Sequence, residues 1–309
     1  MNCLLLRIFS NRTPLFIVAF LIFHLSYSFC AEHVFIVVID GVRYSESFGS
    51  EGKYIPHMWN ELRPQGTIFT NFRNDGTTTT CPGHASMLTG VWQKIANDGT
   101  EPFHDPTIFE LFRKQKGMRE HSCFVVSGKA KLHVLTHSAD ATLGAKYQAA
   151  LAVDDSGDNI RTWQKLSSVM DQYHPHVVII NFAETDLLGH AGAWSRYLTA
   201  LREIDSIIGL LWKRIQSDSV YKNTTTMFVT NDHGRHDDQH GGFKNHGDSC
   251  EGCRHIMLLA IGPHFSAGKI IDDKTYQIDI APTAAELLGI KIPTVQGRTL
   301  LRRRDVEEK

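Results

Sequence analysis

The sequence predicts an α/β fold, a doubly wound three-layer αβα sandwich around a mostly parallel central sheet. Five near-continuous apolar runs rich in β-branched residues predict its strands, at 33–40, 122–128, 176–184, 225–232 and 255–263. Because polar residues do not alternate along these runs, they are typical of strands buried on both faces, as in a parallel sheet. Helical patterns lie between the runs, and this alternation indicates helices packed on a single sheet.

Three helices are expected between the strands, over 106–117, 158–175 and 193–215. The first begins with a proline and ends at a glycine, and the second begins at an N-cap-type aspartate and stops at a proline. The third carries apolar residues at helical spacing. The sequence has no internal repeat, low-complexity linker or break in composition, so one domain over 32–309 is predicted.

The first 31 residues predict a secretory signal peptide, which is not part of the fold. Arg7 and Arg12 give a positive start, and the apolar run 15–23 is followed by small and polar residues. This run is shorter than the ~20 residues that a membrane span needs. The expected location is therefore the periplasm or the cell exterior, with no membrane span after cleavage. An uncleaved membrane anchor is the weaker alternative.

The composition is that of an ordinary globular protein, with 42% hydrophobic and 21% charged residues among 309. A formal net charge of −1 gives no nucleic-acid-binding signature and no bulk attraction to acidic membranes. The 17 histidines point to metal or proton chemistry, although a surface rich in histidine would give the same count. The oligomeric state is not indicated.

The close pair Cys250 and Cys253 predicts a disulfide within a loop, which export of the chain would permit. A reduced pair is the alternative. A zinc knuckle is not expected, because it would need a second cysteine pair and the sequence has none.

Ionisable residues follow three of the predicted strands, at the place where an open α/β sheet carries its active site. Asp40 ends the first run, Asp186 and His190 follow the third, and Asp232 and His233 end the fourth. A buried carboxylate at a strand end is costly unless it is paired or bound to metal. Aspartate oxygen and histidine nitrogen together suit zinc or a similar divalent ion, so the pattern predicts a metal site.

The loop before the fifth run adds two histidines, His240 and His246. The nearby acidic residues Glu184, Asp237 and Asp238 are not needed to complete two coordination shells. Any one of these side chains alone could be a helix cap or a solvated loop residue. Their placement after equivalent strands favours metal binding for the set.

A run of threonines at 77–80 precedes Pro82, which is typical of the start of a helix. The free backbone N–H groups of a helix start suit a phosphate. The run is therefore a candidate for the reacting residue, but physical argument alone does not choose between Thr79 and Thr80.

Taken in order, these segments resemble the alkaline phosphatase superfamily, most closely its type I phosphodiesterase/nucleotide pyrophosphatase and sulfatase-like branches. The matching pieces are "VIDGVR" (38–43), "TCPGH" (80–84), "TDLLGHAG" (185–192), "TNDHG" (230–234), "NHG" (245–247), "IGP" (261–263) and "DIAPTAAELLGI" (279–290). The resemblance implies an alkaline-phosphatase-like catalytic domain over 32–309.

The resemblance also implies two divalent metal ions, expected to be zinc. One ion would be held by Asp186, His190 and His246, and the other by Asp40, Thr80, Asp232 and His233. Pro82 fixes the register that makes Thr80 the nucleophile. Asn97 is the nearest match to an asparagine that contacts a substrate phosphate oxygen in diesterases, with a plain turn as the alternative. His246 is preferred to His240 because "NHG" lies nearest the following strand.

The implied activity is hydrolysis of a small-molecule phosphate ester through a covalent phospho-threonine, with a phosphodiesterase or nucleotide pyrophosphatase favoured. The alternatives are a phosphomonoesterase or a phospho-headgroup transferase of the same fold. A non-catalytic binding protein that retains the fold is the alternative from another class. A sulfatase is not expected, because Cys81 is one residue out of register and His84 stands where sulfatases carry arginine.

Overall fold

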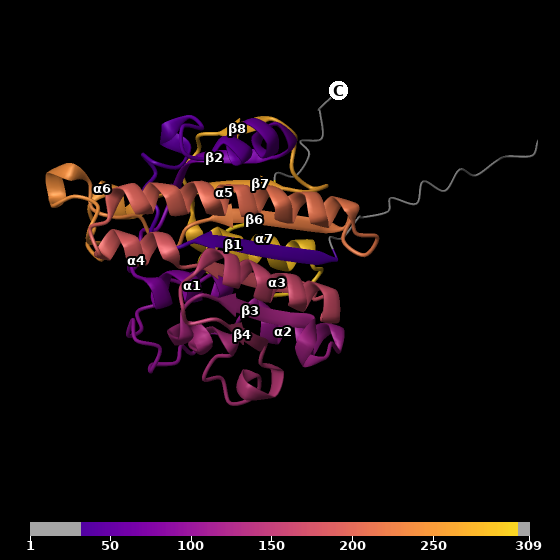
Figure 1. Cartoon of the computed structure of the whole chain (residues 1–309). Helices are drawn as coiled ribbons and strands as arrows, with labels where there is room; N and C mark the ends of the chain where they lie inside the picture. The colour runs from indigo at the N-terminus through magenta and orange to yellow at the C-terminus, as the bar shows by residue number, and fades with distance from the viewer. Residues whose placement is uncertain (1–31, 302–309) are drawn as a thin grey trace, which may run out of the picture.

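The computed structural model describes residues 32–301, so the predicted signal peptide (1–31) and residues 302–309 lie outside it. Within the described residues, nine strands form one sheet (Figure 1). They are β1 (His33–Ile39), β2 (Thr67–Arg73), β3 (Cys123–Ser127), β4 (Ala150–Val153), β5 (Val177–Phe182), β6 (Thr225–Thr230), β7 (His255–Ile261), β8 (Lys269–Ile271) and β9 (Thr275–Tyr276). Their order across the sheet is β4-β3-β5-β1-β6-β7-β2-β8, and β9 pairs with β2.

The five predicted strands correspond to β1, β3, β5, β6 and β7, and the prediction of a mostly parallel sheet is confirmed. β1 pairs in parallel with β5 and β6, and β3 pairs in parallel with β4 and β5. The exception is β7, which runs antiparallel to both β6 and β2. A loop joins β6 to β7 without crossing the sheet, and a connection that returns on the same edge produces an antiparallel neighbour.

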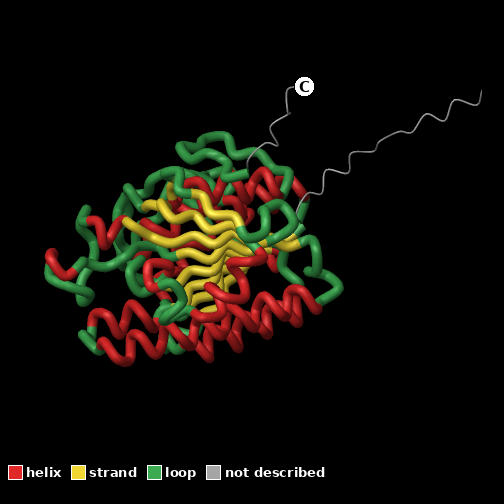
Figure 2. Tube along the Cα trace, turned by 90° about the horizontal axis from the view of Figure 1, so that it is seen from above, coloured by secondary structure: helices red, strands yellow, loops and turns green. Residues whose placement is uncertain are grey.

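Helices cover both faces of the sheet, as the sequence predicts (Figure 2). They are α1 (Thr80–Thr89), α2 (Ile108–Lys116), α3 (Asn159–Tyr173), α4 (Glu184–His190), α5 (Trp194–Ser217), α6 (Glu251–Arg254) and α7 (Ile280–Leu287). Alternate residues of β1 enter two separate cores. Val34 and Ile36 pack in one core with α1, α2 and α7, whereas Phe35 and Val37 pack in the other with α3 and α5. This two-sided burial explains why β1 has no polar alternation.

The ends of α2 and α3 are set by local capping, at the places where the sequence predicts them. Thr107 and Glu110 form a capping box at the start of α2, and Gly117 ends that helix in the left-handed conformation. The Asp158 carboxylate accepts a backbone N–H at the start of α3, and His174 ends it in the left-handed conformation. The cap residues therefore fix where these helices meet their strands.

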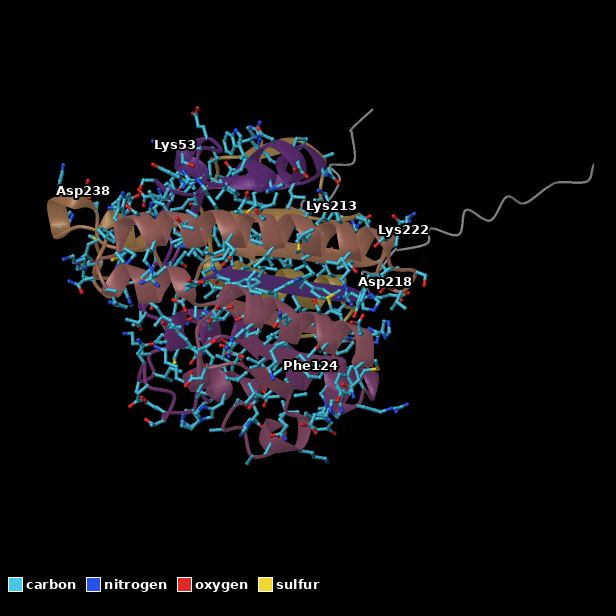
Figure 3. All side chains as sticks on the ribbon, in the orientation of Figure 1. Lys53, Phe124, Lys213, Asp218, Lys222 and Asp238 are labelled. Carbon is cyan, nitrogen blue, oxygen red and sulfur yellow. The ribbon has the colours of Figure 1, made fainter. Side chains whose placement is uncertain are left out.

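The carboxyl ends of β1, β3, β5 and β6 meet at one edge of the sheet, because these neighbouring strands are parallel. α4 and α6 lie at this end of the molecule (Figure 1). The loop carrying Asp238 projects from the same end, and Asp218 and Lys222 mark the opposite end (Figure 3). Among residues 32–301, no helix has both the length and the apolar character needed to cross a membrane.

Asp205 joins α5 to the π-helical segment His57–Leu62, and we expect the fold to depend on it. Its buried carboxylate accepts the backbone N–H groups of His57 and Met58, each at 2.8 Å. Asp205→Ala would leave both donors unsatisfied, so the free energy of unfolding should fall by about 2–4 kcal/mol. Urea unfolding followed by circular dichroism measures this change.

The matched control is Ser206→Ala, which removes an exposed side chain from the next position of α5. Its free energy of unfolding should stay within about 0.5 kcal/mol of the parent value. Equal losses in the two variants would contradict the role given to Asp205.

Candidate active site and metal centre

The first cluster of possible metal ligands lies at the carboxyl ends of the parallel strands. It consists of Asp40, Asp232 and His233, which are fully buried. Asp40 follows β1, and the other two follow β6. One possible ligand atom from each residue lies within 4.8 Å of the others. The parallel pairing of β1 with β6 brings these residues together, because the two strands end side by side.

Each residue of this cluster has one polar atom held by the protein and one left over. Asp232 Oδ1 accepts the N–H groups of Gly41 and His233 at 3.1 and 3.0 Å. His233 Nδ1 donates to the Gly234 carbonyl at 2.8 Å, which leaves Nε2 with its lone pair. Within residues 32–301, no hydrogen-bond partner is found for Asp40 Oδ1, Asp232 Oδ2 or His233 Nε2. Three unpartnered, buried acceptor atoms this close together fit a divalent cation.

The ionisation of these groups also fits a cation. Burial, followed by the nearby Asp40, raises the pKa of Asp232 to about 7. Burial lowers the pKa of His233 to about 4, so its imidazole is neutral and free to act as a ligand. A bound divalent ion would offset the repulsion between the two carboxylates.

The second cluster consists of Asp186, His190 and His246, whose ligand atoms also lie within 4.8 Å of one another. Asp186 and His190 lie one turn apart on α4, as their spacing predicts. The Nε2 atoms of His190 and His246 are 3.1 Å apart, and they lie 3.4 and 3.5 Å from Asp186 Oδ1. His246 Nδ1 donates to the Thr78 carbonyl at 3.0 Å, so its Nε2 lone pair faces the cluster. The pKa of His246 is lowered to about 3, mainly by burial and secondly by the nearby His233.

Lys129 lies between the two clusters and was not predicted. Its Nζ is 2.9 Å from Asp40 Oδ2 and 2.6 Å from Asp186 Oδ2, so Asp40 Oδ1 is left for the first cluster. Arg235, also buried, donates to Asp186 Oδ1. Burial opposes the charge of Asp186, but Lys129, His233 and Arg235 outweigh it and hold the pKa of this carboxyl well below its usual value. Lys129 directly follows Gly128 after β3, so the rule of strand ends applied to that strand would have found it.

Thr80 is the first residue of α1, and its side chain is buried. Its Oγ1 has no hydrogen-bond partner in the described part of the chain. His84, one helical turn after Thr80, connects Thr80 to the first cluster. Its Nδ1 donates to the Thr80 carbonyl at 2.9 Å and lies 3.5 Å from Asp232 Oδ2. Asn181 donates to both His84 Nε2 and Asp40 Oδ2, at 3.2 and 2.8 Å. The start of α1 is therefore fixed against the first cluster.

Asn97 also lies at the start of α1. Its Oδ1 accepts the Cys81 N–H at 2.9 Å and lies 3.3 Å from Lys131 Nζ. The structure thus brings this predicted residue to the first turn of α1, next to Thr80. Whether it contacts a substrate stays a prediction.

Other residues of the loop lie apart from both clusters. His240 is exposed and its Nδ1 pairs with Asp237 at 2.6 Å, so the preference for His246 agrees with the geometry. The predicted disulfide is wrong for this structure, in which Cys250 and Cys253 are free thiols. The physical reason is a competing partner, because both thiols hydrogen-bond to the carboxylate of Asp248.

A family model for type I phosphodiesterase/nucleotide pyrophosphatase matches residues 34–240, which is more than half of the chain. The chain belongs to this family. The match extends from β1 through β6 and includes every predicted site residue except His246. The resemblance stated from the sequence is therefore confirmed at the level of the family.

Solved structures of other proteins share the fold of this chain. A protein of the alkaline phosphatase superfamily from Vibrio parahaemolyticus superposes with a TM-score of 0.62 at 17% identity. The superposition covers 88% of this chain and 70% of that one. Murine ectonucleotide pyrophosphatase/phosphodiesterase 5 gives a TM-score of 0.61 at 14% identity, covering 86% and 97%. The predicted alkaline-phosphatase-like fold is confirmed.

Among curated sequences, GPI ethanolamine phosphate transferase 2 of Aspergillus fumigatus is 35% identical over 130 residues, which are 37% of this chain and 16% of the relative. For eight curated relatives, the match covers between 16% and 26% of the relative's length. The family is thus established.

We predict that divalent metal stabilises this family member through the two clusters. After chelation, adding Zn²⁺ should raise the free energy of unfolding by about 3–4 kcal/mol at 100–1,000 times the dissociation constant. His190→Ala should hold less metal and show a smaller rise, because it removes a ligand from the second cluster. Metal analysis and thermal unfolding measure both effects.

His240→Ala is the matched control, since both histidines are exposed and lie at the same end of the molecule. It should bind metal as the parent chain does. If His240→Ala loses metal and His190→Ala does not, the assignment of the second cluster is overturned.

Proposed function

We propose that this chain is a metal-dependent phosphoric ester hydrolase that uses Thr80 as its nucleophile and favours phosphodiester or pyrophosphate bonds. The observation that carries the proposal is the buried, unpartnered Thr80 hydroxyl at the start of α1, next to a cluster of unpartnered aspartate and histidine atoms. Family membership supports the same class of enzyme. An inactive threonine-to-alanine variant of the murine relative, solved in complex with AMP, is consistent with a threonine nucleophile.

The donor sets suit two divalent ions, with zinc favoured because oxygen and nitrogen ligands are mixed. One would be held by Asp40, Thr80, Asp232 and His233, and the other by Asp186, His190 and His246. When bound, such ions supply Lewis-acid chemistry, which acidifies a hydroxyl or a water and balances the charge of the phosphoryl group.

The chain itself binds and orients the phosphoryl group. The first turn of α1 presents the positive end of the helix dipole to the phosphoryl oxygens, while Asn97 accepts the Cys81 N–H and Pro82 has no N–H to offer. Asn97 and Lys131 lie beside this turn and can add hydrogen bonds to the same group. The substrate is thereby held with phosphorus facing Thr80 Oγ1.

The reaction follows in two displacements. The Thr80 hydroxyl loses its proton to solvent and attacks phosphorus, so that an Oγ–P bond forms as the bond to the leaving oxygen breaks. The leaving group takes a proton from water. A water molecule then attacks the phospho-threonine, the Oγ–P bond breaks, and Thr80 regains a proton. No side-chain base is needed beyond the groups described.

Lys129 and His84 act as positioning residues in this scheme. Lys129 holds Oδ2 of Asp40 and Oδ2 of Asp186, so Oδ1 of each carboxylate faces its own cluster, where Arg235 also contacts Asp186 Oδ1. Burial lowers the pKa of His84, which stays neutral and holds the Thr80 carbonyl and Asn181 in place. The charge of Lys129 and the hydrogen bonds of both residues set the orientation of the ligands and the nucleophile.

A phospho-headgroup transferase is the second candidate, because a transferase is among the relatives. It would use the same phospho-threonine and differ only in the acceptor of the second displacement, an alcohol in place of water. We also propose export of the chain to the periplasm or the exterior, on the basis of the leader predicted over 1–31.

Thr80→Ala should lower kcat at least about 10³-fold, because it removes the group that forms the covalent bond. Asp40, Asp232 and His233 still offer three ligands to the first ion, so metal content should fall less than in His190→Ala, and thermal stability should change little. Thr79→Ala is the matched control and should keep most activity. Loss of activity in Thr79→Ala with retention in Thr80→Ala would reassign the nucleophile, and activity in both would refute the covalent mechanism.

Bis(p-nitrophenyl) phosphate should be hydrolysed with a kcat/KM at least about tenfold above that of p-nitrophenyl phosphate. A strong preference for the monoester would instead identify a phosphomonoesterase. The same assay with added ethanolamine or glycerol separates the second candidate, because a transferase would form the phosphorylated alcohol faster than it releases the hydrolysis product.

A further inference from the structure

The loop between β6 and β7 contains a third group of metal-ligand side chains, outside the two clusters described above. It consists of His236, Asp248, Cys250 and Cys253, whose ligand atoms all lie within 4.8 Å of one another. We propose that these four side chains bind a structural zinc ion. This inference goes beyond the proposed function, because the group includes neither Thr80 nor a residue of the catalytic clusters.

The chemistry of the donors favours zinc over other common ions. Two thiolates, one imidazole and one carboxylate form a four-ligand set of the kind that closes a tetrahedral zinc site, with Zn–S bonds of ~2.3 Å and Zn–N bonds of ~2.0 Å. Four protein ligands leave no open position for water, which is typical of structural rather than catalytic zinc. The chain has one close cysteine pair, and the fold brings the other two donors, His236 and Asp248, to it.

The side chains already face one another. His236 Nε2 is 3.2 Å from Asp248 Oδ2, and it has no hydrogen-bond partner among residues 32–301. The Asp248 carboxylate also hydrogen-bonds to both thiols. A zinc ion would replace the thiol protons in this arrangement and give the buried His236 nitrogen a partner.

Backbone N–H groups reach both sulfur atoms, although burial raises the pKa of both thiols and keeps them protonated until a metal displaces the protons. The backbone N–H of Gly247 donates to the Cys253 sulfur, and the N–H groups of Asp237 and Cys253 donate to the Cys250 sulfur. Donated N–H groups favour the charged form of an acceptor, and zinc requires thiolates. Cys253 is fully buried, which protects such a site from solvent.

Two glycines let the backbone form this turn. A Cβ at Gly252 would lie 2.5 Å from the Arg235 carbonyl oxygen, and a Cβ at Gly234 would lie 2.0 Å from the Gly252 carbonyl oxygen. Only glycine permits such a close approach at these positions. The chain at 234–237 is therefore pressed against the turn Cys250–Cys253, which brings His236 to the two thiols.

A zinc ion here would support the active site through the backbone. Thr78 Oγ1 donates to the Asp248 carbonyl at 2.7 Å, and the Thr78 carbonyl accepts from His246 Nδ1 at 3.0 Å. Fixing Asp248 therefore fixes the segment that carries His246. The ion would act by positioning this ligand, not by contacting substrate.

A neighbouring group, Asp237, His240 and Cys250, shares one cysteine with the proposed site. It offers three donors instead of four, and His240 Nδ1 is already bonded to Asp237. The group with two thiols is therefore the favoured zinc site. Substitution of His236 tests that group, and substitution of His240 tests the neighbouring one.

Cobalt reconstitution of the full chain tests the proposal. The chelated and reduced protein is loaded with Co²⁺, and the near-ultraviolet thiolate-to-cobalt charge-transfer band is recorded. The catalytic clusters contain only oxygen and nitrogen donors, so the band reports the sulfur site alone. We expect the band in the parent chain, its loss in Cys253→Ser, and a shifted or weakened band in His236→Gln.

The controls are His190→Ala, His240→Gln and Cys81→Ser, which should keep the band. A parent chain without the band, or a band that survives Cys253→Ser, would overturn the proposal, as would a band lost in His240→Gln and kept in His236→Gln. A Cys250–Cys253 disulfide in the intact mass of the unreduced protein would overturn it too.

A measurement on the parent chain covers the case in which Cys253→Ser does not fold. Titration of the zinc-loaded chain with p-hydroxymercuribenzoate should release one equivalent of zinc as Cys250 and Cys253 react. Reaction of both thiols without zinc release would contradict the site. Neither result depends on turnover, so the proposed hydrolase activity stands or falls separately.

Discussion

The burial of Asp40, Asp186 and Asp232 at one edge of the sheet is the constraint around which this end of the molecule is arranged. An ionised carboxylate removed from water costs several kcal/mol unless opposite charge and hydrogen bonds replace the lost solvent. Lys129 and Arg235 supply part of that charge. They leave Asp40 Oδ1 and Asp232 Oδ2 without partners in the described structure, so the balance is incomplete without a further cation.

The direction of β7 determines how the histidines reach this edge. Because β7 is antiparallel to β6, the segment between them starts and ends at the carboxyl end of β6. Because this segment does not cross a face of the sheet, it stays at the end of the molecule that carries the two clusters. His233, Arg235 and His246 come from this one segment, and so does the sulfur-containing group around Cys253. A parallel β7 would have needed a crossover and would have carried much of the segment away.

The sequence predicted most of the sheet because β1, β3, β5, β6 and β7 are long and apolar throughout. It did not reveal β2, β4, β8 and β9. The strands β4, β8 and β9 are short and partly exposed, and β2 mixes polar with apolar residues and is only partly buried in its second half, so their composition carries little signal. The strand-end rule found Asp40, Asp186 and Asp232 because each follows a recognisable strand. Lys129 obeys the same rule, because it follows β3 by two residues. The group of His236 and Asp248 with two thiols depends on how a long loop folds back, which spacing along the chain does not encode.

The threonine run 77–80 connects these parts, because Thr77 and Thr78 contact different parts of the site and Thr80 begins α1. The Thr77 carbonyl lies 3.3 Å from Asn74 Nδ2, which also donates to the Asp232 carbonyl. Thr78 orients His246 through its carbonyl and holds Asp248 through its hydroxyl. Thr79 is the N-cap position of α1, and Thr80 begins the helix. β-branched side chains restrict this backbone, so a shift of the loop at Asp248 would be transmitted to His246 and to the start of α1 together. The positions of ligand and nucleophile are therefore coupled through one short, stiff segment.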